Sequence, residues 1–173
     1  MKNILPKSAL ISLSDKTSLD LLVSFLLERN VEIISTGGTY KAIKKITNNV
    51  MEVSEYTGHK EMMGGRVKTL HPKIHAGILA RRGEDTDILK SMDYKEIDIV
   101  VVNLYPFEET INSGCSFEEA IEQIDIGGPT MIRAAAKNFK DVLVLSDPSD
   151  YEEMISEWDS KNGISYEFRK KQA

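Results

Sequence analysis

The sequence predicts an α/β fold in which a mainly parallel sheet is flanked by helices, giving three layers. Short apolar runs alternate along the chain with segments whose apolar residues recur every three or four positions. The run at 97–102 is the strongest strand signal because it is almost continuously apolar and β-branched, as expected of a central parallel strand covered on both faces. Such alternation of strands and helices is typical of layered α/β domains.

The individual elements follow from the same patterns. We predict strands at 9–13, 31–35, 97–102 and 141–145. We predict helices at 19–27, 40–46, 117–124, 129–137 and 148–158, and the start of another at 165–173. Pro72 is expected to prevent a regular helix between His71 and His75, and we predict no zinc site there.

Length and composition favour one cytoplasmic domain. With 173 residues and an apolar fraction of 41%, we expect a single domain over residues 1–173. The net charge of −5 argues against a general nucleic-acid binder. Cys115 is the only cysteine, so no internal disulfide can form and a reducing compartment is expected. No apolar run reaches membrane-spanning length and the start lacks a signal-peptide core, so we predict no membrane partner.

The segment at 64–72 is the strongest indication of a binding site. It places the guanidinium of Arg66, the ammonium of Lys68 and the hydroxyl of Thr69 beside the pair Gly64 and Gly65. Such donors can converge on one small anionic or carbonyl-rich ligand, and the glycines let the backbone approach it. The alternative is a solvated basic loop without a ligand.

Two loops between a strand and a helix suit phosphate binding. One carries Ser14, Asp15 and Lys16, and the other is Thr36-Gly37-Gly38-Thr39. Free N–H groups at a helix start attract anions, and paired glycines can form a concave anion-binding turn. The alternatives are an ordinary helix cap for the first loop and a plain turn for the second. Neither is a Walker A loop or a G-x-G-x-x-G motif.

Two further segments carry polar groups in places suited to chemistry. Asn103 and Tyr105 follow the strongest strand, although Tyr105 could simply cap the core with its ring. Asp125 precedes a helix start at 127–130, where N–H groups favour a carboxylate. We expect that helix to be buried, so Lys137 on it indicates a paired or functional lysine.

Together these segments resemble the cyclohydrolase domain of the bifunctional purine-biosynthesis enzyme AICAR transformylase/IMP cyclohydrolase. The matching stretches, in family order, are 12–17, 35–39, 64–72, 75–81, 103–107 and 124–138. Several are long and nearly verbatim, so the resemblance is specific. It implies a methylglyoxal synthase-like fold, in agreement with the pattern of strands and helices.

The resemblance implies ring closure of FAICAR to inosine monophosphate (IMP) with loss of water, without a metal or redox cofactor. By analogy, Lys137 would transfer the proton and Asp125 would orient the carboxamide nitrogen. Lys68 and Tyr105 would stabilise or protonate the developing oxyanion. The substrate-binding groups it implies are Ser12, Ser14, Asp15, Lys16, Thr36, Gly37, Gly38, Thr39, Arg66, Thr69, Asn103, Ile126 and Gly127.

The family protein also carries a larger second domain, which transfers a formyl group from 10-formyltetrahydrofolate to AICAR. We expect that domain to be absent and residues 1–173 to stop short of the cyclohydrolase domain's end. The resemblance implies a homodimer for the full-length protein, whereas this chain could be a monomer or a weaker dimer.

Two other functions remain open on the same fold. A methylglyoxal synthase would share the fold, but the segment around Arg66 and the helix from Asp125 to Lys137 do not resemble that family's site. A non-catalytic regulatory module would keep the phosphate loops without needing Asp125, Tyr105 and Lys137 together. A measurement of enzymatic turnover separates the regulatory module from the enzyme.

Overall fold

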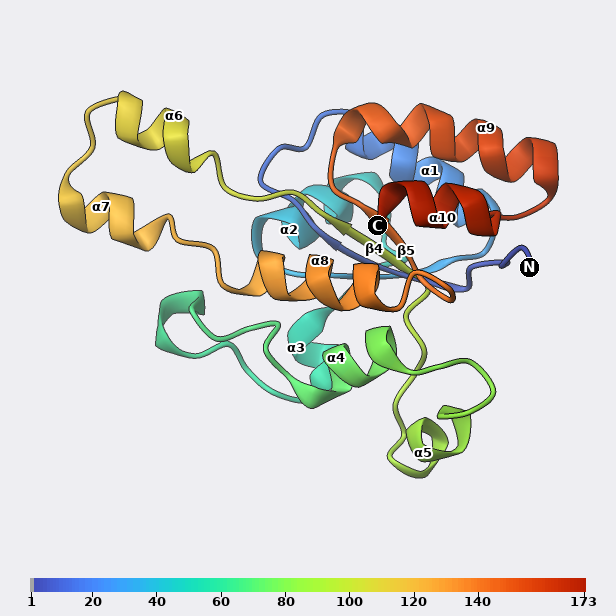
Figure 1. The fold of residues 1–173 in the computed structure, drawn as a ribbon. Coiled ribbons are helices and arrows are strands. Elements are labelled where there is room, and N and C mark those ends of the chain that lie inside the picture. The colour runs from blue at the N-terminus through green and yellow to red at the C-terminus, as the bar shows by residue number, and fades with distance from the viewer. Residues whose placement is uncertain (1) are drawn as a thin grey trace.

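The structure is a computed structural model that describes residues 2–173 (Figure 1). Its centre is one sheet of five strands in the order β3-β2-β1-β4-β5, and every neighbouring pair is parallel. The strands are β1 (Ser8–Ser12), β2 (Glu32–Ser35), β3 (Met51–Glu52), β4 (Ile99–Val102) and β5 (Leu143–Leu145). The predicted α/β class with a parallel sheet is confirmed.

Helices cover both faces of the sheet, which gives the three predicted layers (Figure 1). One face carries α1 (Leu19–Glu28), α2 (Gly37–Ile46), α9 (Tyr151–Lys161) and α10 (Tyr166–Gln172). The other face carries α3 (Val53–Thr57), α4 (Pro72–Leu79) and α8 (Gly127–Lys137). The remaining helices are α5 (Thr86–Ser91), α6 (Phe107–Asn112), α7 (Phe117–Glu122) and the short 3₁₀ turns η1 (Met63–Gly65) and η2 (Pro148–Asp150).

The central strand β4 shows why the sheet needs two helical layers. Ile99 and Val101 pack into the core on the α1 side, whereas Val100 and Val102 pack into the core on the α8 side. All four side chains are essentially inaccessible to solvent. Because successive strand residues point to opposite faces, a strand that is apolar at every position must be covered on both.

Several elements escape prediction because they are short. Strand β3 has two residues, and α3, α5 and α6 have five or six each, too few for a hydrophobic period to be read. The helix predicted at 148–158 is split into η2 and α9.

The expectation that Pro72 prevents a helix is wrong. Pro72 is the first residue of α4, where a missing N–H costs no intrahelical hydrogen bond. The ring nitrogen Nδ1 of His71 accepts the N–H of Lys73 at 3.1 Å and caps the helix. Proline at this position begins the helix instead of breaking it.

Helices α6 and α7 extend away from the sheet at one end of the molecule (Figure 1). The chain leaves β4 at its carboxyl end, forms this pair of helices and returns to the sheet at α8. Among residues 2–173, we find no helix of the length and apolar character that spanning a bilayer requires.

Candidate functional site

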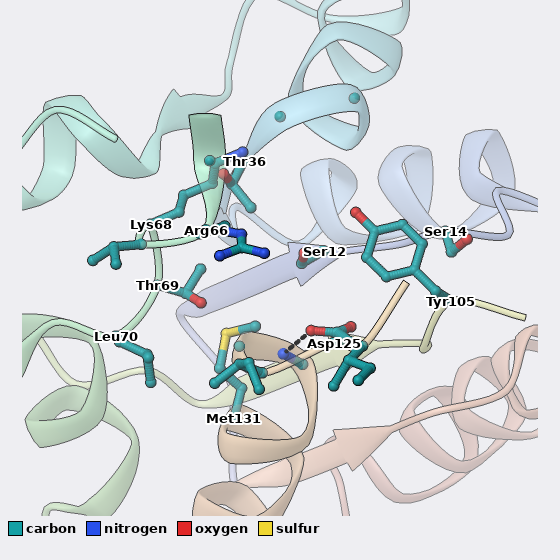
Figure 2. Close-up of a pocket in the computed structure, with 18 of the residues that line it drawn as sticks. Ser12, Ser14, Thr36, Arg66, Lys68, Thr69, Leu70, Tyr105, Asp125 and Met131 are labelled. Carbon is teal, nitrogen blue, oxygen red and sulfur yellow. Dashed lines mark hydrogen bonds between the residues drawn. The ribbon is translucent and has the colours of Figure 1, made fainter. Parts of the chain in front are cut away.

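A cavity of about 690 Å³ opens at the carboxyl ends of β1, β2 and β4 (Figure 2). Parallel α/β sheets bind ligands at this edge, where the strand ends and following loops meet. Of the residues singled out from the sequence, those lining the cavity are Ser12, Ser14, Thr36, Gly37, Gly38, Thr39, Arg66, Lys68, Thr69, Asn103, Tyr105, Asp125, Ile126 and Gly127. The structure thus brings these residues together around one cavity.

The amino-terminus of α2 forms one wall of the cavity. Its cap residue Thr36 has extended backbone, and its side chain makes no capping hydrogen bond. The first N–H groups of a helix have no partner within the helix, so residues 37–39 present backbone donors to the cavity. Gly37 has a φ of 56°, a conformation that glycine adopts without strain. This wall is suited to an anion.

Lys68 reaches across to that helix start. Its Nζ lies 3.1 Å from the point where a Cβ on Gly37 would stand. The same Nζ forms an ion pair with Glu61 at 2.8 Å, and the hydrogen bond from Lys68 lowers the pKa of the Glu61 carboxyl. The Lys68 side chain is only 25% exposed, so the ammonium is partly withdrawn from solvent. The site thus combines an ammonium with the positive end of a helix.

Arg66 enters the cavity from a small hairpin. Backbone hydrogen bonds between Met62 and Val67 close this hairpin. The Arg66 guanidinium makes two hydrogen bonds to the carboxylate of Glu122 at the end of α7, which raises the pKa of Arg66. This pair joins the two sides of the cavity, although its members lie 56 positions apart in the sequence.

Asp125 stands at the beginning of α8. Its Oδ1 accepts the N–H of Gly128 at 2.8 Å, so the carboxylate is held at a helix amino-terminus, as predicted. A Cβ on Gly128 would stand 2.5 Å from Oδ2 of the same carboxylate and 2.7 Å from Leu104, which explains the glycine. Asp125 lines the same cavity as Lys68 and Thr69, and the dashed line in Figure 2 marks its hydrogen bond with Gly128.

Tyr105 lies on the connection between β4 and α6 and lines the cavity (Figure 2). It is 52% exposed and lines the cavity, so it does not cap the core as the alternative interpretation required. Its phenol is therefore available to a ligand.

Asn103 makes contacts with the protein that the sequence does not predict. Its Oδ1 accepts the N–H groups of Ser14 and Asp15 at 2.7 and 3.0 Å, and its Nδ2 donates to the carbonyl of Asp15 at 2.7 Å. Three hydrogen bonds commit the carboxamide to the loop after β1. Asn103 therefore positions that loop at the edge of the cavity.

Thr39 is similarly committed. Its hydroxyl accepts the N–H of Leu13 at 2.8 Å and donates to the carbonyl of Leu13 at 2.9 Å. This buried hydroxyl therefore joins α2 to the end of β1. Only the backbone of Thr39 remains available to a phosphate, which corrects the expectation that its side chain is a ligand.

The structure does not bring Asp15 and Lys16 into the cavity. Asp15 accepts the N–H and the hydroxyl of Thr17, and Lys16 donates to the carbonyls of Leu13 and Ser14, each at 3.1 Å. Both side chains are exposed and folded onto their own loop. In this arrangement they stabilise the turn, and their expected contact with phosphate stays a prediction.

Lys137, for which a proton-transfer role is expected, is not among the residues that line the cavity. Only one face of α8 is buried, and that face carries Met131, Ala134 and Ala135. Lys137 lies outside it and is exposed. Lys137 is the last residue of α8, about 14 Å along the helix axis from Gly128 at the cavity. The prediction of a buried lysine on this helix is wrong because α8 is amphipathic, and its exposed face carries Lys137.

Residues 19–130 match the family described as the MGS-like domain. This match covers more than half of the chain. The chain belongs to the MGS-like domain family. Residues 135–173 match a second family, described as the AICARFT/IMPCHase bienzyme.

Curated relatives extend the match to almost all of this MGS-like domain. It is 55% identical over 167 residues to the bifunctional purine biosynthesis protein PurH of Clostridium kluyveri, covering 95% of this chain and 34% of that protein. The PurH of Clostridium acetobutylicum is 53% identical over 169 residues, covering 96% of this chain and 34% of that protein. The chain thus spans about a third of the length of these relatives.

A solved structure supports the same fold. The crystal structure of ForH superimposes with a TM-score of 0.81 at 33% sequence identity, covering 96% of this chain and 89% of that one. The methylglyoxal synthase-like fold expected from the sequence is confirmed by this likeness and by the family match.

Two carboxylates of this MGS-like domain were not predicted at the site. Glu61 lies only a few residues before Lys68, so a search for opposite charges near the basic segment could have found it. No signal in the sequence pairs Glu122 with Arg66, because only the path of α6 and α7 brings them together.

Proposed function

We propose that this chain is an IMP cyclohydrolase of purine biosynthesis, which closes the ring of FAICAR to give IMP and water. One observation carries the proposal: Lys68, beside the amino-terminus of α2, and Asp125, at the amino-terminus of α8, line the same cavity. This arrangement offers an anion site and an oriented carboxylate together. The match to PurH proteins supports the same reaction.

The 5′-phosphate binds at the start of α2 in this proposal. The backbone N–H groups of residues 37–39 and the side chains of Ser12, Ser14 and Thr36 are its donors. Ile126 and Gly127 line the opposite wall, where the base lies. A phosphate monoester carries nearly two negative charges, so it uses both the helix dipole and the neighbouring Lys68.

The ring closes by attack of the carboxamide nitrogen on the formyl carbon. Asp125 accepts a hydrogen bond from the carboxamide and orients its nitrogen. The formyl oxygen becomes an oxyanion, which Lys68 and Tyr105 stabilise with help from Arg66 and Thr69. The attacking carboxamide nitrogen loses one proton and the oxygen gains one. The hydroxyl then takes up a second proton and leaves as water, while the formamide nitrogen loses its own proton as the new C=N bond forms, so no net proton is consumed. Because Lys137 lies outside the cavity, Lys68 is the ammonium that supplies the proton.

The proposed reaction neither gains nor loses electrons overall, and the substrate supplies every atom of the products. We therefore propose that it proceeds without a metal or redox cofactor. The formyl donor 10-formyltetrahydrofolate belongs to the transformylase reaction, and we assign it no site on this chain. The partner of this chain is a nucleotide in the cytoplasm.

Conversion of FAICAR to IMP by the purified chain, followed by ultraviolet absorbance without added metal or folate, tests the proposal. We expect turnover that falls by at least roughly a hundredfold in Lys68→Ala, since it loses a donor to the oxyanion. Absence of turnover with IMP still bound would favour the non-catalytic regulatory module. Absence of both turnover and binding would make the proposal wrong.

A further inference from the structure

Both cations of the cavity face a carboxylate. Lys68 pairs with Glu61 at 2.8 Å, and Arg66 makes two hydrogen bonds to Glu122. The carboxylates come from different parts of the chain, Glu61 from the segment before η1 and Glu122 from the end of α7. The proposed reaction uses neither of them.

Both carboxylates remain open to solvent. The side chain of Glu61 is 56% exposed and that of Glu122 is 58% exposed, so neither is needed to satisfy a buried charge. Exposed ion pairs contribute little to stability, so a stronger anion can displace them readily. The position of Lys68 beside the positive end of α2 also makes a negative neighbour favourable when the cavity is empty.

We propose that Glu61 and Glu122 are internal counter-ions that occupy Lys68 and Arg66 in the empty cavity, so that a dianionic phosphate ester must displace them and binds less tightly than it would without them, whereas a neutral nucleoside is unaffected. This inference rests on the proposed function. A phosphate monoester carries close to two negative charges at pH 7 and displaces a single carboxylate. A nucleoside without phosphate has no charge with which to displace either one.

Binding affinities measured by isothermal titration calorimetry at low ionic strength test the inference. The probes are IMP, inorganic phosphate and inosine, and the variants are Glu61→Gln and Glu122→Gln. Each substitution keeps the side-chain size and removes the competing charge. We expect each to tighten binding of IMP and of phosphate by about two- to fivefold, as for loss of an exposed ion pair, and to leave inosine unchanged.

Matched controls remove the same charge elsewhere. Glu118→Gln lies on the same helix as Glu122, and Glu55→Gln lies on α3 upstream of Glu61; both residues are exposed. The inference predicts that the controls tighten phosphate binding less than the counter-ion variants do. If the controls and the counter-ion variants tighten phosphate binding equally, the effect comes from net charge alone, and the inference is wrong.

The remaining outcomes are also decisive. Weaker phosphate binding in Glu61→Gln or Glu122→Gln would show that the carboxylates position the cations, which contradicts the inference. Equal tightening of inosine and IMP would indicate a change in cavity shape and would contradict it too. If no variant binds IMP, the proposed function fails, while the phosphate series still tests the counter-ions. If phosphate also fails to bind, both are wrong.

Discussion

Asn103 ties the carboxyl end of β4 to the loop after β1, because its Oδ1 accepts the N–H of Ser14 at 2.7 Å. The same carboxamide holds Asp15 through one donated and one accepted hydrogen bond. Two adjacent strands thus share one side chain at the edge of the sheet where the cavity opens. The geometry of the loop depends on an atom from a residue 89 positions away.

Asn103→Ala is therefore expected to loosen the loop after β1. We expect KM for FAICAR to rise by at least roughly tenfold and the free energy of unfolding to fall by about 1–2 kcal/mol, since several hydrogen bonds are lost. Steady-state kinetics and urea unfolding measure these effects. Asn103→Asp retains the hydrogen-bond acceptor, so KM should rise less and the free energy of unfolding should fall less than in Asn103→Ala. Equal changes in the two variants would contradict the positioning role.

Gly37→Ala should weaken anion binding at the start of α2. The residue has φ of 56°, and an added Cβ would stand 3.1 Å from the Lys68 ammonium. We expect the affinity for inorganic phosphate to fall by roughly tenfold, measured by calorimetry, from backbone strain and displacement of Lys68. Gly38→Ala, where an added Cβ meets no atom within 4 Å, is expected to lower the phosphate affinity less. The reverse order would argue against the assigned geometry.

Lys137→Ala should leave ring closure nearly intact. The side chain is exposed at the far end of α8, so its loss removes no group from the cavity. We expect kcat within about twofold of the parent, as for exposed residues away from a site. The assay is FAICAR turnover, with Lys68→Ala as the variant that should be inactive. A large loss in Lys137→Ala would restore its expected role in proton transfer.

Stability should decrease as the pH falls below about 6.5, and His75 should cause part of this. Burial lowers the pKa of His75, and its Nε2 is buried without a hydrogen-bond partner among residues 2–173. The unfolded chain then binds a proton at a higher pH than the folded one, so the contribution of neutral His75 is present above the unfolded pKa and lost as pH falls. Urea unfolding at pH 7.5 and 5.5 should show a smaller difference in His75→Gln than in the parent. An unchanged difference would contradict this origin.

Arg169 should be indispensable to the packing of α10. The side chain is 1% exposed, and its guanidinium donates to the carbonyls of Phe139 and Lys140 at 3.0 and 2.7 Å and to that of Ile164. Arg169→Met leaves these buried carbonyls unpaired, so we expect a loss of about 3–5 kcal/mol in the free energy of unfolding. Thermal and urea unfolding provide the measurement. Lys170→Met, at an exposed neighbour, should change stability by less than about 0.5 kcal/mol.

The fold class was determined by the sequence. The apolar pattern at 97–102 requires cover on both faces, and the structure supplies it with α1 on one side and α8 on the other. The sequence also predicted that the strand-to-helix loops lie at one edge of the sheet, because the carboxyl ends of parallel strands are on the same side. The segment around Arg66, Lys68 and Thr69 was found from its local density of donors, which needs no knowledge of distant contacts.

Only the tertiary structure decided what each side chain contacts. Asn103 and Thr39 carry polar groups that suit a ligand, yet both are bonded to loop backbone far away in sequence. Lys137 is on the same helix as Gly127 and Gly128, which line the cavity, but Lys137 itself is not among the lining residues. Local patterns specify the chemical type of a residue and the element that carries it. Which hydrogen bonds form, and which cation finds a carboxylate, depends on packing between elements that lie far apart along the chain.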